Sequence, residues 1–105
     1  MEITNEWLQK HLKSGNVVKF GQLEMRHPCR VLLLVNGGSL SVQAGQGLYS
    51  EPRDLNGPYT HVEVGFAEPL PKWWLNNEDT VMGYVPIHQV IDHVNLHGGV
   101  RNKNI

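Results

Sequence analysis

The sequence is poor in cysteine, in long hydrophobic runs and in charge of one sign. Its single cysteine, Cys29, cannot form an internal disulfide. The longest strictly apolar run, residues 31–35, has five residues, whereas a membrane-spanning helix needs about 20. The first residues, MEITNEW, contain no hydrophobic signal core. Together these absences predict a protein of a reducing, cytoplasmic compartment with no membrane segment.

The formal net charge is only −1, and charged residues make up 18% of the chain. Binding to phosphate backbones depends on clustered lysine and arginine, so direct nucleic-acid binding is not expected. The apolar content, 40% of 105 residues, is that of an ordinary globular chain. This length predicts one domain over residues 1–105. We expect residues 1–2 and 100–105 to be frayed.

Hydrophobic spacing predicts a helix near each end of the chain. The first, in ITNEWLQKHLKSGN, is capped by Thr4 or Asn5 and ends at Gly15. The second, in PIHQVIDHVNLHGG, begins at Pro86 and ends at two glycines, 98 and 99. Its apolar residues recur at the helical spacing of three and four.

Four segments between the helices read as extended. Residues 17–27 contain a bend at Gly21, and residues 59–66 and 81–85 are further strands. In residues 29–45, two β-prone runs flank Asn36-Gly37, which predicts a tight type I′ hairpin turn. Residues 31–35 are apolar on both faces, which favours a central strand. This order predicts an α+β domain: a mainly antiparallel sheet of about five strands, with an N-terminal and a C-terminal helix packed on it.

The stretch NGPYTHVEVGF, residues 56–66, alternates after its turn signal. If Val62, Val64 and Phe66 face the core, then Tyr59, His61 and Glu63 face away, because strand side chains alternate. Arg53 lies upstream in the glycine-rich loop 45–58. These four polar residues form a candidate binding surface. A solvated strand face would show the same pattern, and a His-Glu pair also suits acid–base catalysis.

Trp73 and Trp74 form the second unusual feature. Neighbouring residues of an extended chain point to opposite sides, so one ring is expected in the core while the other faces solvent. An exposed tryptophan on a loop is typical of an interface. Packing of both rings on the sheet is the alternative.

Three other residues suggest chemistry less strongly. His93 and His97 are four apart on the second helix, yet His88 and Asp92 lie away from that pair on a helical wheel, so we expect no metal site. Cys29 borders the most apolar strand, which favours a buried, slowly reacting thiol over a nucleophile.

The chain also contains the pattern EPRDLNGPYTHVEVGF, then a tryptophan-containing segment, then YVPIHQVIDHVNLHGG. This pattern resembles small proteins of unknown activity that phages and prophages carry, and the resemblance covers roughly residues 30–99. It implies a setting rather than a reaction: an accessory protein of a mobile element in a bacterial cytoplasm. Small accessory phage proteins often bind host defence or regulatory proteins, so a host protein is the implied partner.

Our first hypothesis is therefore a non-enzymatic protein that binds and modulates a host protein, such as a CRISPR or other anti-phage component. Its expected binding residues are Arg53, Tyr59, His61, Glu63, Trp73 and Trp74. The second hypothesis is a small-ligand protein in which loop 45–58 and Arg53 hold an anionic nucleotide. The third is a small hydrolase that uses His61 and Glu63. We expect no cofactor, no metal, and a monomer or homodimer.

Overall fold

The computed structural model describes residues 1–26, 29–74 and 80–101, and its elements confirm the α+β class. In chain order they are α1 (Asn5–Leu12), β1 (Val17–Phe20), β2 (Leu23–Arg26), β3 (Leu32–Leu33), β4 (Ser39–Gln43), β5 (His61–Glu68), β6 (Val81–Pro86) and α2 (Ile87–Leu96). The strands form two antiparallel sheets rather than one. β1 pairs with β2, and a four-stranded sheet has the order β3-β4-β5-β6.

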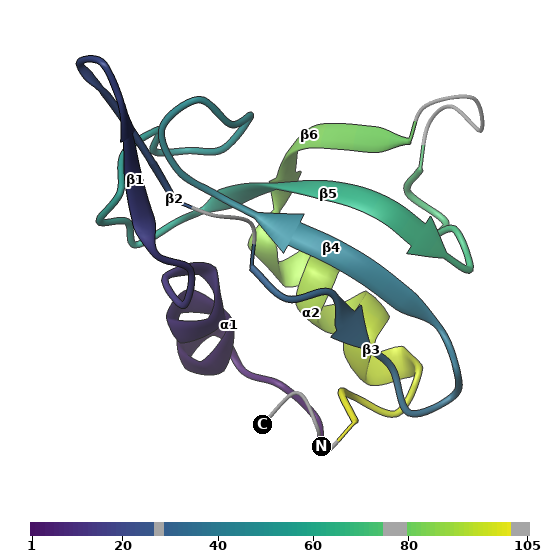
Figure 1. The fold of residues 1–105 in the computed structure, drawn as a ribbon. Helices are drawn as coiled ribbons and strands as arrows, with labels where there is room; N and C mark the ends of the chain where they lie inside the picture. Colours follow the sequence, from purple (N-terminus) through teal and green to yellow (C-terminus); the bar gives the residue numbers. More distant parts are fainter. Residues whose placement is uncertain (27–28, 75–79, 102–105) are drawn as a thin grey trace.

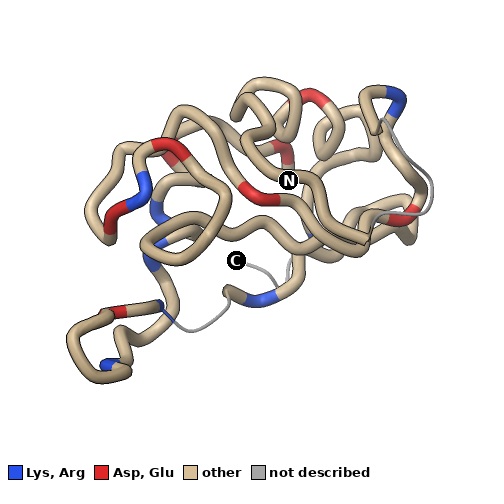
Figure 2. Tube along the Cα trace, turned by 90° about the horizontal axis from the view of Figure 1, so that it is seen from above, with Lys and Arg blue, Asp and Glu red and all other residues tan. Residues whose placement is uncertain are grey.

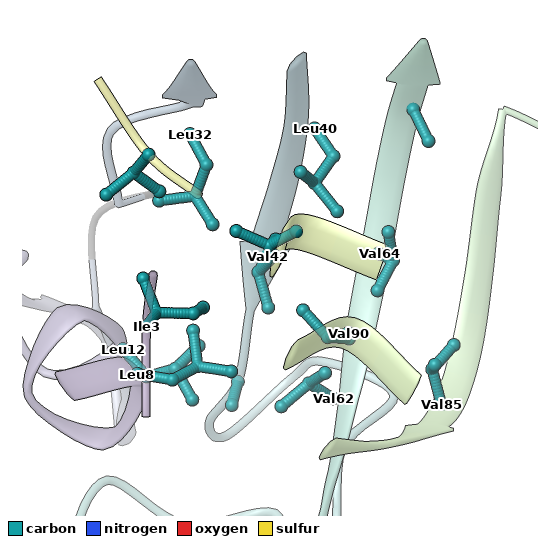
Figure 3. Packing of buried hydrophobic residues seen from close by; sticks show 14 of the residues in the cluster. Ile3, Leu8, Leu12, Leu32, Leu40, Val42, Val62, Val64, Val85 and Val90 are labelled. Carbon is teal, nitrogen blue, oxygen red and sulfur yellow. The ribbon is translucent and has the colours of Figure 1, made fainter. Parts of the chain in front are cut away.

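The four-stranded sheet and α2 form two packed layers. In Figure 1, α2 lies behind β4 and β5, and α1 lies beside the sheet. Val90 of α2 lies close to Val62 and Val64 of β5 in Figure 3, and all three are fully buried. Leu8 and Leu12 of α1 belong to the same core. Among the described residues, no helix covers the opposite face of the sheet.

The ends of the described chain are tied to the sheet and to each other. Gly98 and Gly99, both with φ +87°, turn the chain after α2, so that Val100 forms an antiparallel bridge with Leu34. The Met1 ammonium donates to the Val100 carbonyl at 2.9 Å, and Val100 is fully buried. The expected fraying is therefore wrong for Met1 and Val100. Residues 102–105 lie outside the described residues.

The predicted hairpin at Asn36-Gly37 is confirmed, but its turn is of another type. Leu34 N–H donates to the Gly38 carbonyl at 2.8 Å, and Gly37 N–H donates to the Leu34 carbonyl at 3.0 Å. In this turn only Gly37 has a positive φ, +97°. These bonds define a three-residue loop with a bulged glycine, whereas a type I′ turn needs two left-handed residues.

The expectation that residues 31–35 form a central strand is wrong. β3 has two residues and lies at an edge of the sheet. The chain after α2 covers that edge: Val35 N–H donates to the Gly99 carbonyl at 2.9 Å, and Arg101 N–H donates to the Leu33 carbonyl at 2.8 Å. Only one face of the apolar run is buried: Leu32 and Leu34 are fully buried, whereas Val31 and Val35 are 48% and 49% exposed.

A bulge in β5 overturns the inward placement of Phe66. Ser41 pairs with Gly65 and Ser39 pairs with Glu68, so a two-residue step on β4 faces a three-residue step on β5. The extra residue breaks the alternation. Val62 and Val64 remain fully buried as expected, but Phe66 is 69% exposed with φ +52°. Ala67 points inward in its place.

The prediction that Tyr59 faces away from the core is also wrong, because its side chain is buried, at 2% exposure. It lies before the start of β5, so the strand alternation does not reach it. Its hydroxyl donates to the Asp54 carbonyl at 2.7 Å. The Gln9 side chain accepts from the Tyr59 N–H at 2.9 Å and donates to the Tyr59 carbonyl at 2.7 Å. Tyr59 therefore joins loop 45–58 to α1.

The two tryptophans differ in burial, but both contact the core, because Trp73 packs against the cluster that contains Trp74. Trp74 is 7% exposed and belongs to the core, whereas Trp73 is half-buried. Trp74 is therefore removed from the candidate binding surface.

The hairpin of β1 and β2 projects from the body, as Figure 1 shows. Its apolar side chains Val17, Phe20 and Leu23 are exposed. Arg26 anchors its base, because its guanidinium donates to the carbonyls of Lys13, Gly15 and Leu55, each at 2.9 Å. The hairpin is thus held at one end only.

Cys29 should react slowly in the folded protein. Its side chain is 7% exposed, its sulfur lies 3.5 Å from the Leu12 carbonyl oxygen, and burial raises the pKa of the thiol. Because the thiolate is the nucleophile, we expect labelling by a disulfide reagent to be slower by about ten-fold or more than in denaturant. Fast, stoichiometric labelling of the native protein would contradict this.

Opposite faces of β5 should respond differently to mutation. Val64→Asp places an unpaired charge at a fully buried position, so we expect a loss of several kcal/mol from a total of roughly 5–15 kcal/mol. His61→Ala, at a half-exposed position, should change the free energy of unfolding by less than about 0.5 kcal/mol. Thermal and urea melts of both variants measure this. Similar losses for the two variants would contradict the assigned faces.

Candidate functional site

The uncovered side of the four-stranded sheet is the main candidate surface, and we call it the open face. It contains a hollow of about 230 Å³. The hollow is lined by Ser41, Gln43, Glu63, Gly65, Phe66 and Val81. These residues come from three neighbouring strands, β4, β5 and β6, so the sheet register fixes their spacing.

Glu63 is the charged group of this hollow. Within the part of the chain that the structure describes, its carboxylate accepts no hydrogen bond and joins no ion pair. It is half-buried, and this burial raises the pKa of the carboxyl above its ordinary value. A partly desolvated carboxylate without a partner is a costly group. It is therefore available to a cation from outside the chain.

The floor of the hollow is held by Gln43. Its amide oxygen accepts from Cys29 N–H at 2.8 Å, and its amide nitrogen donates to the Cys29 carbonyl at 3.2 Å and to the Ser41 hydroxyl oxygen at 3.0 Å. Both N–H groups of the amide are thus engaged. Ser41 accepts one of them, and its oxygen has a second lone pair that can accept from a ligand.

Two exposed aromatic residues adopt left-handed backbone conformations. Phe66 has φ +52° and is 69% exposed, and Tyr84 has φ +55° and is 46% exposed. Each lies where the strand register shifts, Phe66 on β5 and Tyr84 on β6. A positive φ costs a bulky residue of order 1–3 kcal/mol. Neither burial in the core nor backbone preference therefore explains why aromatic residues occupy these two positions.

Arg53 lies beside aromatic residues rather than beside Glu63. Its guanidinium is 5.8 Å from the centroid of the Tyr49 ring, and the Tyr49 and Tyr84 rings are 5.9 Å apart. Tyr49 packs on the backbone of β6, because a methyl group at Gly83 would lie 2.6 Å from the Tyr49 Cβ. Arg53, Tyr49 and Tyr84 thus form an exposed cluster at the β6 edge.

His61 is half-exposed at the start of β5, two residues from Glu63. Its Nδ1 lies 2.9 Å from the Thr60 hydroxyl. Among residues 1–26, 29–74 and 80–101, no ion pair joins it to Glu63. The hydrolase hypothesis depends on such a contact, so the geometry lends it no support.

A second hollow, of about 290 Å³, lies between α2 and the segment before the core tryptophan. It is lined by Lys72, Trp73, Gln89, Asp92, His93 and Leu96. His93 is 7% exposed, and its Nε2 has no hydrogen-bond partner among the described residues. Burial, and then the nearby His97, lower the pKa of His93, so its neutral form is favoured. A third hollow is also lined by Trp73, together with β6 residues and Gln89.

Metal ligation is not supported in the described residues, because no three His, Cys, Asp or Glu side chains among them gather around a common point. The His93 and His97 rings are 4.7 Å apart, but they remain a pair. In Figure 2, lysine and arginine are scattered along the described trace together with aspartate and glutamate. No helix in the described ranges is long and apolar enough to cross a bilayer.

Comparison with known proteins gives no match: no family model, no curated protein and no solved structure is significantly similar to this chain. The resemblance to phage proteins therefore stays a prediction, and the candidate site depends on its own geometry.

Of the six expected binding residues, the structure keeps four at or near the surface and buries Tyr59 and Trp74. It places Glu63 on the open face, Arg53 at the β6 edge and Trp73 between two hollows. Sequence reasoning missed Phe66, Tyr84 and Tyr49. The glycines beside the first two, Gly65 and Gly83, were the available sign, since an isolated glycine within a strand often marks a bulge.

Glu63→Gln should stabilise the protein near neutral pH. Since burial raises the folded-state pKa of Glu63, the stability linked to its protonation is present below the unfolded pKa and is lost as pH rises through the folded pKa. Glutamine resembles the protonated form. We expect a gain of less than about 1 kcal/mol near pH 7, because solvent screens a half-exposed group, and no gain below pH about 4.

Thermal melts at the two pH values measure this difference. Glu68→Gln is the matched control, because Glu68 is exposed on the same strand and its replacement should change the melting temperature little. A Glu63→Gln variant that is less stable than the parent near neutral pH would contradict the unpaired state of Glu63.

Proposed function

We propose that this chain is a non-enzymatic, phage-type accessory protein that binds and modulates a host bacterial protein, such as a defence component, through the open face. The cytoplasmic location expected from the sequence belongs to the same proposal. The observation that carries it is Phe66, whose aromatic ring is 69% exposed although its backbone has φ +52°. A strained, exposed aromatic side chain weakens the free protein, and aromatic residues are enriched at protein interfaces.

The open face supports a protein partner better than a reaction. Its hollow is small, about 230 Å³, and it combines an aromatic ring, Val81 and one carboxylate. Hot spots of interfaces have this composition: an apolar anchor beside a charge that becomes desolvated on binding. The exposed cluster of Arg53, Tyr49 and Tyr84 extends the surface to the β6 edge. Tyrosine and arginine are the residue types that dominate such contacts.

Phe66→Gly should separate binding from folding. Glycine adopts positive φ without the roughly 1–2 kcal/mol penalty of other residues, and Phe66 buries little. We therefore expect a melting temperature equal to or above that of the parent. We expect the affinity for the partner to fall by about ten-fold or more, as for an interface anchor.

The partner is captured from bacterial lysate on the immobilised protein, identified by mass spectrometry and purified for calorimetric titration. Leu96→Ala is the control variant, because Leu96 is 75% exposed but lies on α2, in the other layer. Binding that survives Phe66→Gly, or that is lost in Leu96→Ala, would overturn the assignment to the open face.

The second candidate function is binding of an anionic nucleotide, and one observation favours it. The hollow beside Trp73 is lined by an indole that can stack on a base and by Lys72, together with Asp92. Loop 45–58, the site first expected for such a ligand, uses its polar groups internally: the Asp54 carboxylate accepts from two backbone N–H groups. Saturable quenching of tryptophan fluorescence by a nucleotide, absent from Trp73→Ala, would favour this candidate.

A further inference from the structure

The hollow on the open face is organised around one charge that the chain itself does not neutralise. Glu63 has no partner among the described residues. The other polar groups of the hollow carry no charge. The Gln43 amide is hydrogen-bonded to Cys29 and Ser41, and Ser41 has a neutral hydroxyl group. An anion would meet the Glu63 carboxylate, and a neutral group would leave it uncompensated. A cation is the occupant whose charge complements this hollow.

The walls of the hollow favour one kind of cation. Phe66 presents an exposed aromatic ring, and Val81 presents an aliphatic side chain. A guanidinium is planar, bonds a carboxylate through two parallel N–H groups and stacks on aromatic faces, whereas an ammonium is compact and strongly hydrated. A metal ion prefers several oxygen ligands, and here one carboxylate is available. The walls therefore fit arginine better than lysine or a metal.

The size of the hollow limits the occupant to a side chain. Its volume is about 230 Å³, and pockets for drug-sized ligands begin at about 300 Å³. Gly65 lines the hollow and has no side chain to fill it. A methyl group at this position would lie 3.5 Å from Val81 Cγ2 and 3.6 Å from the Thr80 carbonyl oxygen. Those are ordinary contacts, so alanine fits at this position and would narrow the hollow.

We propose that this hollow receives an arginine side chain of the partner protein, with its guanidinium paired to the Glu63 carboxylate and stacked on the Phe66 ring. This inference rests on the proposed function, in which the open face binds a protein. The Ser41 oxygen also lines the hollow, and beside the lone pair that accepts from Gln43 it has a second one for a guanidinium N–H. The expected partner is therefore a protein with an exposed arginine side chain that can reach the open face.

The test uses N-acetyl-arginine-methylamide as the probe and backbone amide NMR shifts of the whole chain as the readout. We expect saturable shifts centred on Glu63, Gly65 and Phe66, with a dissociation constant on the order of 10 mM, as for a single side-chain contact. The neutral isostere N-acetyl-citrulline-methylamide should cause none. Glu63→Gln should weaken arginine binding by about five-fold or more, and Gly65→Ala should weaken it by filling space. Glu68→Gln, exposed on the same strand, should leave binding unchanged.

The outcomes separate this inference from the proposed function. Equal shifts with arginine and citrulline, no saturable shift, or unchanged binding in Glu63→Gln would each overturn the arginine pocket. If the captured partner is lost in Phe66→Gly but fully retained in Glu63→Gln, the open face still binds a protein and only the arginine pocket fails. If Phe66→Gly retains the partner, the proposed function fails whatever the probe does.

Discussion

The constraint on which this structure depends is that one helix covers one side of a four-stranded sheet. Burial of Val62 and Val64 against α2 fixes the inward face of β5, and the neighbouring strands follow through their register. With α1 packed at the side of the same core, no helix of the described chain remains for the other side. The open face is therefore a direct result of the element order, and a sheet with a single covered side must carry polar or partner-binding residues on the other.

The class of the fold and the assignment of the helices could be predicted from the sequence, because both depend on local spacing and caps. Thr4 accepts from Trp7 N–H at 3.2 Å and begins α1, as an N-cap residue should. Glu63 could be placed correctly because Val62 and Val64 on either side of it are fully buried. These predictions hold wherever a strand keeps its period of two, which is the case from His61 to Gly65.

The remaining errors share one physical cause. The prediction extended the alternation of inward and outward side chains beyond the positions where it stops, and strand pairing rather than local sequence sets those positions. A bulge exists only relative to the partner strand, so the outward turn of Phe66 depends on how β4 and β5 meet. Tyr59 lies outside β5, and its burial follows from hydrogen bonds to Gln9, fifty residues away. Coverage of the β3 edge by residues near Val100 is likewise a long-range event. Gly65 is a local sign of the bulge at Phe66, but the burial of Tyr59 and the coverage of the β3 edge depend on residues far away in the sequence.

The projecting hairpin has a consequence for how the molecule unfolds. β1 and β2 pair with each other, are exposed at Val17, Phe20 and Leu23, and are joined to the body chiefly through Arg26. A two-stranded ribbon without a covering layer is only marginally stable by itself. The hydrogen bonds between β1 and β2 can therefore open while the core remains intact. The amide protons of the hairpin then exchange with solvent at a rate set by this local opening. The molecule thus has two cooperative unfolding units, the hairpin and the core, instead of one.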